Sequence, residues 1–304
     1  MIKIFGHKAP DTDATCSAII WSWFLGTKDV EATPYVLGEP NTEAAFVLAH
    51  WGYATPELLQ DVDADDMVII VDTNNPAELP EGINDATVVE IIDHHMLVGG
   101  LQTKQPINIT IEPVAATATV MANMMGDDLE TAPDAIKGLI LSCILSDTLE
   151  YRSPTTTDVD VALAESLAEE LGLDVSTYAA EMFAAKSDVS HYSDAELLRL
   201  DSKEYAVDGT KFRVSVLETT SPETVLSRKA SLMTTMSTVA AEDGVDQVLL
   251  FVVDILKEQA TLLIPNDMVK QVAEKSFDVA VTGDNVILPG VVSRKKQIIP
   301  SLAV

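Results

Sequence analysis

The sequence predicts an α/β protein with a mostly parallel N-terminal sheet flanked by helices and a smaller C-terminal α/β domain. In the first half, short β-branched runs alternate with helical patterns, as in parallel sheets built from strand–helix–strand units. A polar stretch without periodicity, Ser187–Ser193, then precedes a second series of strands and helices. We therefore expect a domain at residues 1–188, a linker at 189–194 and a domain at 195–304.

The first half opens with a short apolar strand at Ile2–Phe5. Met67–Val71 and Val88–Ile92 are continuous apolar runs rich in β-branched residues, which indicates strands buried on both faces. The other expected strands are Thr33–Leu37 and Ile107–Ile111. The expected helices are Ala14–Leu25, Glu43–Trp51, Ala115–Met125, Ala135–Leu145, Val159–Leu171 and Val175–Lys186.

In the second half, a strand at Phe212–Leu217 is followed by a helix across Pro222–Ala241. Gln247–Val253 is a strong apolar strand, and Ala260–Ile264 is expected to pair with it. Further short elements are expected up to the C-terminus. The chain has no internal repeat, low-complexity tract or heptad pattern.

The chain is strongly acidic, with a formal net charge of −29 in 304 residues. This charge argues against nucleic acid and anionic membranes as partners, because both bind basic surfaces. No apolar run reaches the roughly 18 residues that a membrane span needs. An anionic substrate would require metal ions or a local basic cluster to attract it.

The expected location is the cytoplasm. The N-terminal residues Met1–Lys8 are too short and too charged for a signal peptide. The two cysteines, Cys16 and Cys143, lie in apolar helical patterns, which favours buried thiols in a reducing compartment.

Acidic residues and histidines follow three of the expected strands, and one more acid ends an apolar helix. Because ligands of open α/β sheets bind beyond the carboxyl ends of the strands, these loops should meet at one edge. The residues are His7, Asp11 and Asp13 after the first strand, Asp72 after Met67–Val71, Asp93, His94 and His95 after Val88–Ile92, and Asp147 after Ala135–Leu145.

Such a gathering of carboxylates indicates a metal centre. Five crowded carboxylates would repel one another and raise their own pKa values unless divalent cations neutralised them. Six or seven ligands suit two adjacent metal ions that share a carboxylate. Imidazole and carboxylate ligands without thiolate favour Mn²⁺ or Co²⁺ over structural zinc, and the histidines argue against a pure Mg²⁺ site.

Each of these residues also has a purely structural interpretation. Asp11 and Asp13 precede a helix, where carboxylates serve as caps, and Asp72 can be a turn residue. Asp93 can orient a ligand imidazole instead of binding a metal itself. The His94–His95 pair can lie on the surface. The combined presence of these groups at one sheet edge favours the metal centre.

A basic cluster lies near the C-terminus. Ser293–Gln297 contains Arg294, Lys295 and Lys296 in a row. The run is either a solvated basic tail or the group that attracts an anion to this acidic protein. Arginine grips phosphate oxygens in a bidentate fork, which fits the second interpretation.

Together these segments resemble the family II inorganic pyrophosphatases of the DHH phosphoesterase superfamily, over the whole chain. Asp93–His95 is similar to the motif that names the superfamily. Gly6–Asp13 resembles its first metal-binding loop, and Asp72–Asn74 resembles its third segment. Ser293–Gln297 resembles the C-terminal motif specific to the pyrophosphatases. The glycine-rich motif ending in histidine that marks the nucleotide-cleaving relatives is absent.

The resemblance implies two α/β domains, a site for two tightly bound Mn²⁺ ions, with Co²⁺ as a substitute, and additional Mg²⁺ that enters with the substrate. His7, Asp11 and Asp72 would hold one metal ion. Asp13, Asp72, His94 and Asp147 would hold the other. Lys203, Arg294 and Lys295 would bind pyrophosphate, and His95 would contact the attacked phosphate. A homodimer through the N-terminal domain, and no control by adenine nucleotides, are implied as well.

The expected reaction is hydrolysis of pyrophosphate to two orthophosphates by a hydroxide that bridges the metal ions. His95 would donate a proton or a hydrogen bond, and the two domains would close over the substrate. Two other functions remain open. One is a related phosphoesterase acting on short oligonucleotides, cyclic dinucleotides or polyphosphate, although aromatic residues for stacking bases make up only 5% of the chain. The other is a non-catalytic metal-binding or phosphate-sensing protein.

Overall fold

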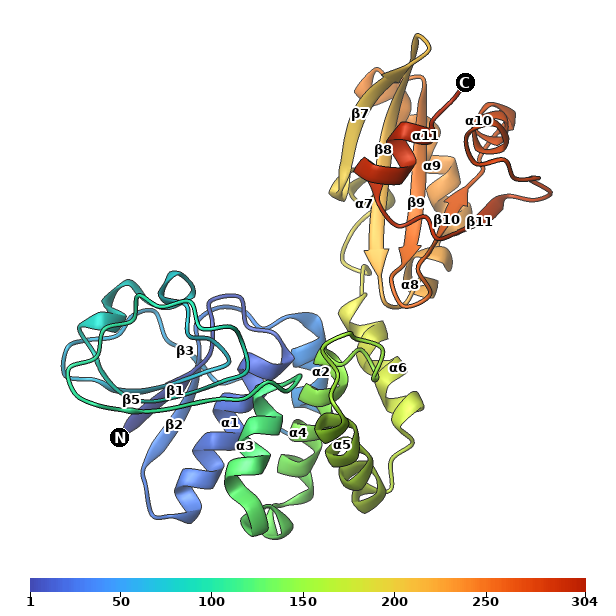
Figure 1. Ribbon diagram of the computed structural model, residues 1–304. Coiled ribbons are helices and arrows are strands. Elements are labelled where there is room, and N and C mark those ends of the chain that lie inside the picture. Colours follow the sequence, from blue (N-terminus) through green and yellow to red (C-terminus); the bar gives the residue numbers. More distant parts are fainter. The chain divides into compact units, whose positions relative to one another are not determined.

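The computed structural model describes residues 1–304, which form two compact units, Met1–Lys186 and Ser187–Val304 (Figure 1). Each unit has its own sheet and its own core, so the predicted α/β fold class is confirmed. Val189 and Tyr192, from the expected linker, pack against the core of the second unit. No helix is both long enough and apolar enough to cross a membrane.

The first unit contains a six-stranded sheet in which all neighbouring strands are parallel. The strand order is β3-β2-β1-β4-β5-β6, so the chain starts in the middle, runs to one edge and then returns to build the other half. The strands are β1 (Ile2–Phe5), β2 (Ala32–Val36), β3 (Glu57–Leu58), β4 (Met67–Val71), β5 (Thr87–Asp93) and β6 (Asn108–Ile111).

The helices of the first unit lie on one side of this sheet in Figure 1. Shorter turns and loops cover the other side, where Leu79 and Ile83 pack against Val68 and Ile70 of β4. The helices are α1 (Thr12–Thr27), α2 (Thr42–His50), α3 (Thr117–Met125), α4 (Asp134–Asp147), α5 (Asp158–Leu171) and α6 (Val175–Lys186), and the short turns η1 (Pro76–Glu78), η2 (Glu81–Asn84) and η3 (Gly126–Thr131).

The second unit contains a five-stranded sheet in the order β11-β10-β9-β8-β7. Only β8 and β9 are parallel, and the predicted pairing of Ala260–Ile264 with Gln247–Val253 is the antiparallel pair β9–β10. The strands are β7 (Ser202–Val207), β8 (Thr210–Thr219), β9 (Gln247–Asp254), β10 (Gln259–Leu263) and β11 (Asn285–Pro289).

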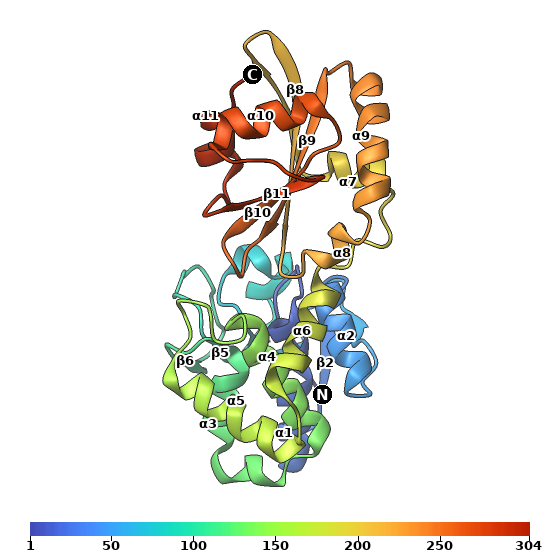
Figure 2. The same cartoon turned by 90° about the vertical axis from the view of Figure 1, so that its right-hand side faces the viewer.

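Helices cover both faces of this sheet, which explains the unbroken apolar run of β9. Leu249, Phe251 and Val253 face the core beneath α10, whereas the alternate residues of β9 face α7 and α9. Figure 2 shows these helices on opposite sides of β9. The helices are α7 (Asp194–Leu200), α8 (Glu223–Leu226), α9 (Lys229–Asp243), α10 (Asp267–Phe277), η4 (Arg294–Ile298) and α11 (Ile299–Ser301).

Two features of the second unit differ from the expectations. The single helix expected at Pro222–Ala241 is wrong, because the chain forms α8 and α9 with an interruption at Ser227 and Arg228. The side chain of Arg228 pairs there with Asp194 at 2.5 Å and with the Val189 carbonyl at 3.1 Å. The helix α7 and the strand β7 were not expected.

Candidate active site

The candidate metal centre lies where the strand order of the first sheet reverses. β1 and β4 are neighbours, but β2 follows on one side and β5 on the other, so the loops after β1 and β4 diverge and leave room for a ligand. His7 lies two residues after β1, and Asp72 follows β4 directly. The predicted convergence of these loops is therefore a consequence of the topology.

A close approach of β1 to α1 positions the first loop. A Cβ atom at Gly6 would lie 2.7 Å from the Cβ of Ala14, so only glycine fits there without a shift. Asp11 caps α1 by accepting a hydrogen bond from the Ala14 backbone at 3.0 Å through Oδ1. Its other oxygen, Oδ2, lies 3.7 Å from Nε2 of His7. Asp11 is thus a helix cap and a member of the cluster at once.

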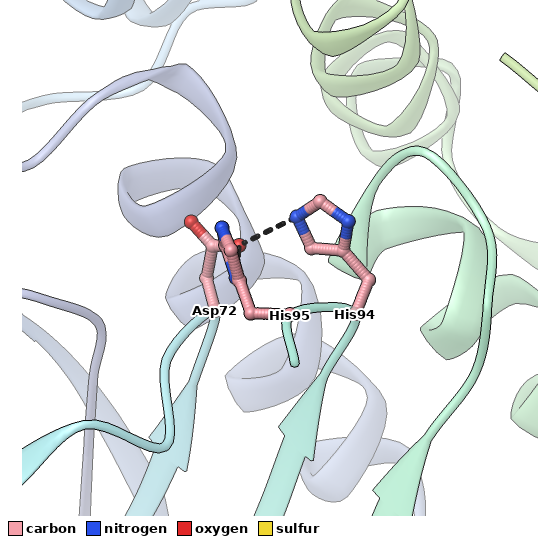
Figure 3. Close-up of side chains that lie close together, drawn as sticks. All are labelled: Asp72, His94 and His95. Atoms are coloured by element: carbon pink, nitrogen blue, oxygen red, sulfur yellow. Dashed lines mark ion pairs between the residues drawn. The ribbon is translucent and has the colours of Figure 1, made fainter. Parts of the chain in front are cut away.

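Asp72 lies at the centre of the cluster. Its Oδ2 is 3.5 Å from Nε2 of His7. Its Oδ1 is 3.4 Å from Nε2 of His94, and Figure 3 shows this pair. The hydroxyl of Thr117 donates a hydrogen bond to Oδ1 at 2.9 Å. Asp72 has a φ of 58°, a left-handed conformation that aspartate adopts at lower cost than most residues.

Two more carboxylates meet on the other side of His94. Asp13, in the first turn of α1, accepts hydrogen bonds from the backbone of Thr117 at 2.6 Å and of Ala118 at 3.2 Å, at the start of α3. Asp147 is the last residue of α4. The Nδ1 atom of His94 lies 3.2 Å from the carbonyl of Val114, which leaves Nε2 directed at the carboxylates.

Three overlapping sets of donor atoms could each hold a metal ion. Within each set the donor atoms lie within 4.8 Å of one another. Asp72 belongs to two sets and His94 to two, so neighbouring ions could share a ligand. The sets are His7, Asp11 and Asp72; Asp13, His94 and Asp147; and Asp72, His94 and His95.

The electrostatics of the donors fit divalent cations. Burial, together with the charge of Asp72, raises the pKa of the Asp13 carboxyl to about 7. Burial and the charge of Asp13 likewise raise the pKa of Asp147 well above its usual range. No lysine or arginine neutralises either carboxylate. Metal ions would supply the missing positive charge.

Neighbouring carboxylates raise the pKa values of His7 and His94. Burial alone would lower the pKa of His7, but Asp11 and Asp72 outweigh it and raise that pKa to about 10. For His94, burial is again outweighed, chiefly by Asp72 and Asp13, and its pKa rises to about 9. Both imidazoles are therefore protonated at neutral pH in the metal-free protein, and bound metal ions would displace these protons.

Asp93 interacts with His95 and lies outside the three donor sets. It is completely buried, and its Oδ1 is 2.9 Å from Nδ1 of His95 and accepts the backbone N–H groups of His94 and His95 at 2.8 and 3.1 Å. Its Oδ2 accepts a hydrogen bond from the Asn74 amide at 2.6 Å. Asp93 thereby fixes the ring of His95 and leaves its Nε2 available to another group.

The expected substrate residues meet in the second unit. Lys203 on β7 and Arg294 and Lys295 on η4 line a cavity of about 490 Å³. Asp201 orients Arg294, because its Oδ1 lies 2.8 Å from the guanidinium and its carbonyl accepts a hydrogen bond at 2.9 Å. Arg294 and Lys295 of the basic run are therefore part of a folded pocket and not of a solvated tail.

Two polar residues of the first unit have roles that were not expected from the sequence. Thr117 contacts both Asp13 and Asp72 and so connects the two carboxylates. Asn74 bonds Asp93 and also holds the following loop through Met96 and Val98. The position of Asn74 two residues after Asp72 was a usable signal. Nothing in the sequence around Thr117 distinguishes it from an ordinary residue of a helix N-terminus.

Comparison with known proteins places these units in a family. The model of the DHH family N-terminal domain matches residues 1–147, and that of the DHHA2 domain matches residues 180–303. The manganese-dependent inorganic pyrophosphatase of Bacillus subtilis is 37% identical over 303 residues, which cover 99% of this chain and 97% of that protein. The chain belongs to the manganese-dependent inorganic pyrophosphatase family.

Solved structures agree with this family assignment. A Methanococcus jannaschii protein assigned to the family II inorganic pyrophosphatases has 34% sequence identity and a TM-score of 0.61, with 99% of this chain and 98% of that one covered. An exopolyphosphatase-related protein from Bacteroides fragilis is 14% identical, with a TM-score of 0.52, and covers 98% of this chain and 89% of its own. The second likeness concerns the fold alone. The predicted resemblance to the pyrophosphatase family is confirmed.

Proposed function

We propose that the chain is an inorganic pyrophosphatase that hydrolyses pyrophosphate to two orthophosphates and depends on two Mn²⁺ ions. The observation that carries this proposal is the cluster of buried carboxylates and histidines at the sheet reversal, which lacks a neutralising lysine or arginine. The family relation over 99% of the chain supplies the substrate class. Mn²⁺ suits mixed imidazole and carboxylate donors.

His7, Asp11 and Asp72 would hold one ion, and Asp13, Asp72, His94 and Asp147 the other. The clustering of His7 with Asp11 and Asp72, and of Asp13 with His94 and Asp147, supports this division. The approach of Asp72 Oδ1 to Nε2 of His94 at 3.4 Å supports Asp72 as the shared ligand. When bound, the metal ions would polarise phosphoryl oxygens and lower the pKa of a water molecule so that it becomes a nucleophile at neutral pH. Thr117 and the start of α3 hold Asp13 and Asp72 in place for that role.

His95 would contact the phosphate that is attacked. Its interaction with Asp93 holds the ring in one orientation, and Asp93 raises the pKa of the imidazole, which favours the protonated, hydrogen-bond-donating form. Lys203, Arg294 and Lys295 would bind phosphoryl oxygens of pyrophosphate and stabilise the charge that develops on the leaving phosphate.

Several finer assignments belong to the same proposal. Co²⁺ would replace Mn²⁺ at the donor sets, and Mg²⁺ would enter with the substrate. The protein would act in the cytoplasm, where its two buried cysteines stay reduced. It would form a homodimer through the N-terminal unit, and β6 supports this, because it is an edge strand whose Ile109 is 54% exposed.

The test is phosphate release by the metal-stripped protein, with Mg²⁺ present and Mn²⁺ added or withheld. Tripolyphosphate, ADP and a linear dinucleotide are assayed beside pyrophosphate. Fast release from pyrophosphate that rises with Mn²⁺ is the expected result. Cleavage of the dinucleotide or tripolyphosphate without pyrophosphate turnover would assign the chain to a different phosphoesterase activity. Metal binding without any turnover would indicate a sensor.

A further inference from the structure

Glu43 is a completely buried carboxylate that belongs to none of the three donor sets. It lies in the first turn of α2. Three groups converge on its Oε2 atom, and these are the Thr12 hydroxyl at 3.1 Å, the Ser146 hydroxyl at 2.8 Å and the Lys186 ammonium at 3.0 Å. Its Oε1 atom has no hydrogen-bond partner.

The two hydroxyl groups belong to residues adjacent to candidate metal ligands. Thr12 lies between Asp11 and Asp13 at the start of α1, and Ser146 directly precedes Asp147 at the end of α4. Both Thr12 and Ser146 are buried. One oxygen atom of Glu43 therefore joins the two backbone segments that carry Asp13 and Asp147.

The third group connects this point to α6. Lys186 is the last residue of α6 and of the first unit. The helices α2, α4 and α6 pack against one another, as both views show (Figures 1 and 2). Lys186 is the only cationic partner of Glu43, and the side chain of Lys186 is 37% exposed.

We propose that Glu43 is a positioning residue that sets the affinity of the metal site formed by Asp13, His94 and Asp147. The inference rests on the proposed function, because it requires that this set binds a divalent ion. Two carboxylates on different helices bind one ion more tightly when their separation is fixed before binding. Glu43 fixes it by accepting hydrogen bonds from a neighbour of each.

A purely structural role would not need this arrangement. A buried carboxylate with a single, partly exposed cationic partner is expensive to desolvate, and an apolar side chain of similar volume often fills such a position equally well. The distinction is measurable, because residues that orient ligands typically change metal affinity by roughly 10- to 100-fold when replaced.

The experiment measures Mn²⁺ binding to the metal-stripped full-length protein by calorimetry and by the electron paramagnetic resonance signal of free Mn²⁺. The variants are Glu43→Met, which keeps the volume but accepts no hydrogen bonds, and Glu43→Gln, which keeps one acceptor oxygen. We expect the wild type to bind two ions. Glu43→Met should weaken one of the two sites by roughly 10-fold or more, and Glu43→Gln should weaken it less.

Ser146→Ala and Ser142→Ala form a matched pair on α4. Ser146→Ala removes one of the Glu43 contacts and should weaken the same metal site. Ser142 lies one turn earlier and bonds Trp51 and Tyr178 instead of Glu43, so Ser142→Ala should leave Mn²⁺ affinity unchanged. Thermal unfolding of each metal-free variant reports whether it is folded, and Ser146→Ala tests the proposal if Glu43→Met does not fold.

Three outcomes would contradict the positioning role or the proposed function on which it rests. If the wild type binds two ions and every folded Glu43 and Ser146 variant binds them with wild-type affinity, the positioning role is wrong while the metal centre stands. If the wild type binds no Mn²⁺, the proposed function itself fails. A loss of thermal stability in Glu43→Met without any change in affinity would identify Glu43 as a structural residue only.

Discussion

At the scale of single residues, Asp72 is the group with the most connections in the cluster. Both of its oxygens face imidazoles, and it belongs to two of the three donor sets. Burial would raise the pKa of Asp72, but hydrogen bonds from His7 and His94 outweigh it and hold that pKa below its usual range. The carboxylate is therefore charged and ready to bind cations at neutral pH.

Replacing Asp72 tests its shared role. Asp72→Asn keeps the shape of the side chain but removes its charge and one acceptor oxygen. We expect turnover to fall by roughly 10²- to 10³-fold, the loss typical for removal of one electrostatic group from an active site. Mn²⁺ stoichiometry and phosphate release are the measurements. Asp66→Asn is the control, because Asp66 pairs with Lys3 outside the cluster. Equal effects of the two variants would contradict the shared role.

Arg294 offers a second test at this scale. Arg294→Lys keeps the charge but loses the planar fork, so KM for pyrophosphate should rise by about 10-fold, equivalent to one charge-assisted hydrogen bond. Lys296→Gln is the matched control, since Lys296 belongs to the same basic run but does not line the pocket. The prediction fails if Lys296→Gln raises KM as much as Arg294→Lys does.

At the scale of elements, helix α4 carries Asp147 to the cluster and is held by close packing. Gly138 on α4 faces the indole of Trp51, and a Cβ atom there would overlap the ring. The Trp51 Nε1 atom also donates hydrogen bonds to Ser142 at 3.2 Å and to Tyr178 at 2.8 Å, which joins α4 to α6. The glycine thus sets how closely the chain after α2 approaches α4.

Two glycine substitutions in helices separate packing from helix propensity. Gly138→Ala should destabilise the protein by about 1–3 kcal/mol, because it overpacks the contact with Trp51. Gly26→Ala on α1 meets no atom within 4 Å, so it should be neutral or stabilise by up to about 1 kcal/mol. Thermal or denaturant unfolding measures both. Destabilisation by Gly26→Ala, or none by Gly138→Ala, would contradict the packing argument.

At the scale of the whole molecule, the chemistry is divided between two units with separate cores. All candidate metal donors lie in Met1–Lys186, whereas Lys203, Arg294 and Lys295 lie in Ser187–Val304. The fold of the first unit therefore accounts for the metal centre by itself. The second unit accounts for a basic pocket on an otherwise acidic chain.

A fragment comprising residues 1–186 tests this division. It should fold and bind Mn²⁺. Its affinity for Mn²⁺ should fall by less than roughly 10-fold, which is the loss expected when a residue that orients a metal ligand is removed. It should not hydrolyse pyrophosphate, because the basic pocket is missing. Circular dichroism, Mn²⁺ titration and phosphate release check these points. A folded fragment that binds no Mn²⁺ would show that the metal centre depends on the second unit.

In the second unit, the sequence marks the start of α7 clearly and β7 only faintly. Ser193 and Glu196 form a reciprocal capping box, a signature visible in the sequence before Leu197 and Leu198, and it starts α7. No residue of β7 is buried, so its hydrophobic pattern is faint. The break between α8 and α9 contains neither glycine nor proline, and Arg228 in this break pairs with the distant Asp194.

The sequence by itself determined the α/β class, most strands and helices, and the residue types of the metal centre, because buried apolar runs and donors that follow strands are local patterns. The tertiary structure alone decided three other matters. These are that Asp11 is both a cap and a member of the cluster, that Asp93 interacts with His95 outside the donor sets, and that Glu43 joins the segments of Asp13 and Asp147. The first two roles involve local contacts, and the sequence left them open as alternatives. The contacts of Glu43 span 31 and 103 positions, and helix packing alone creates them.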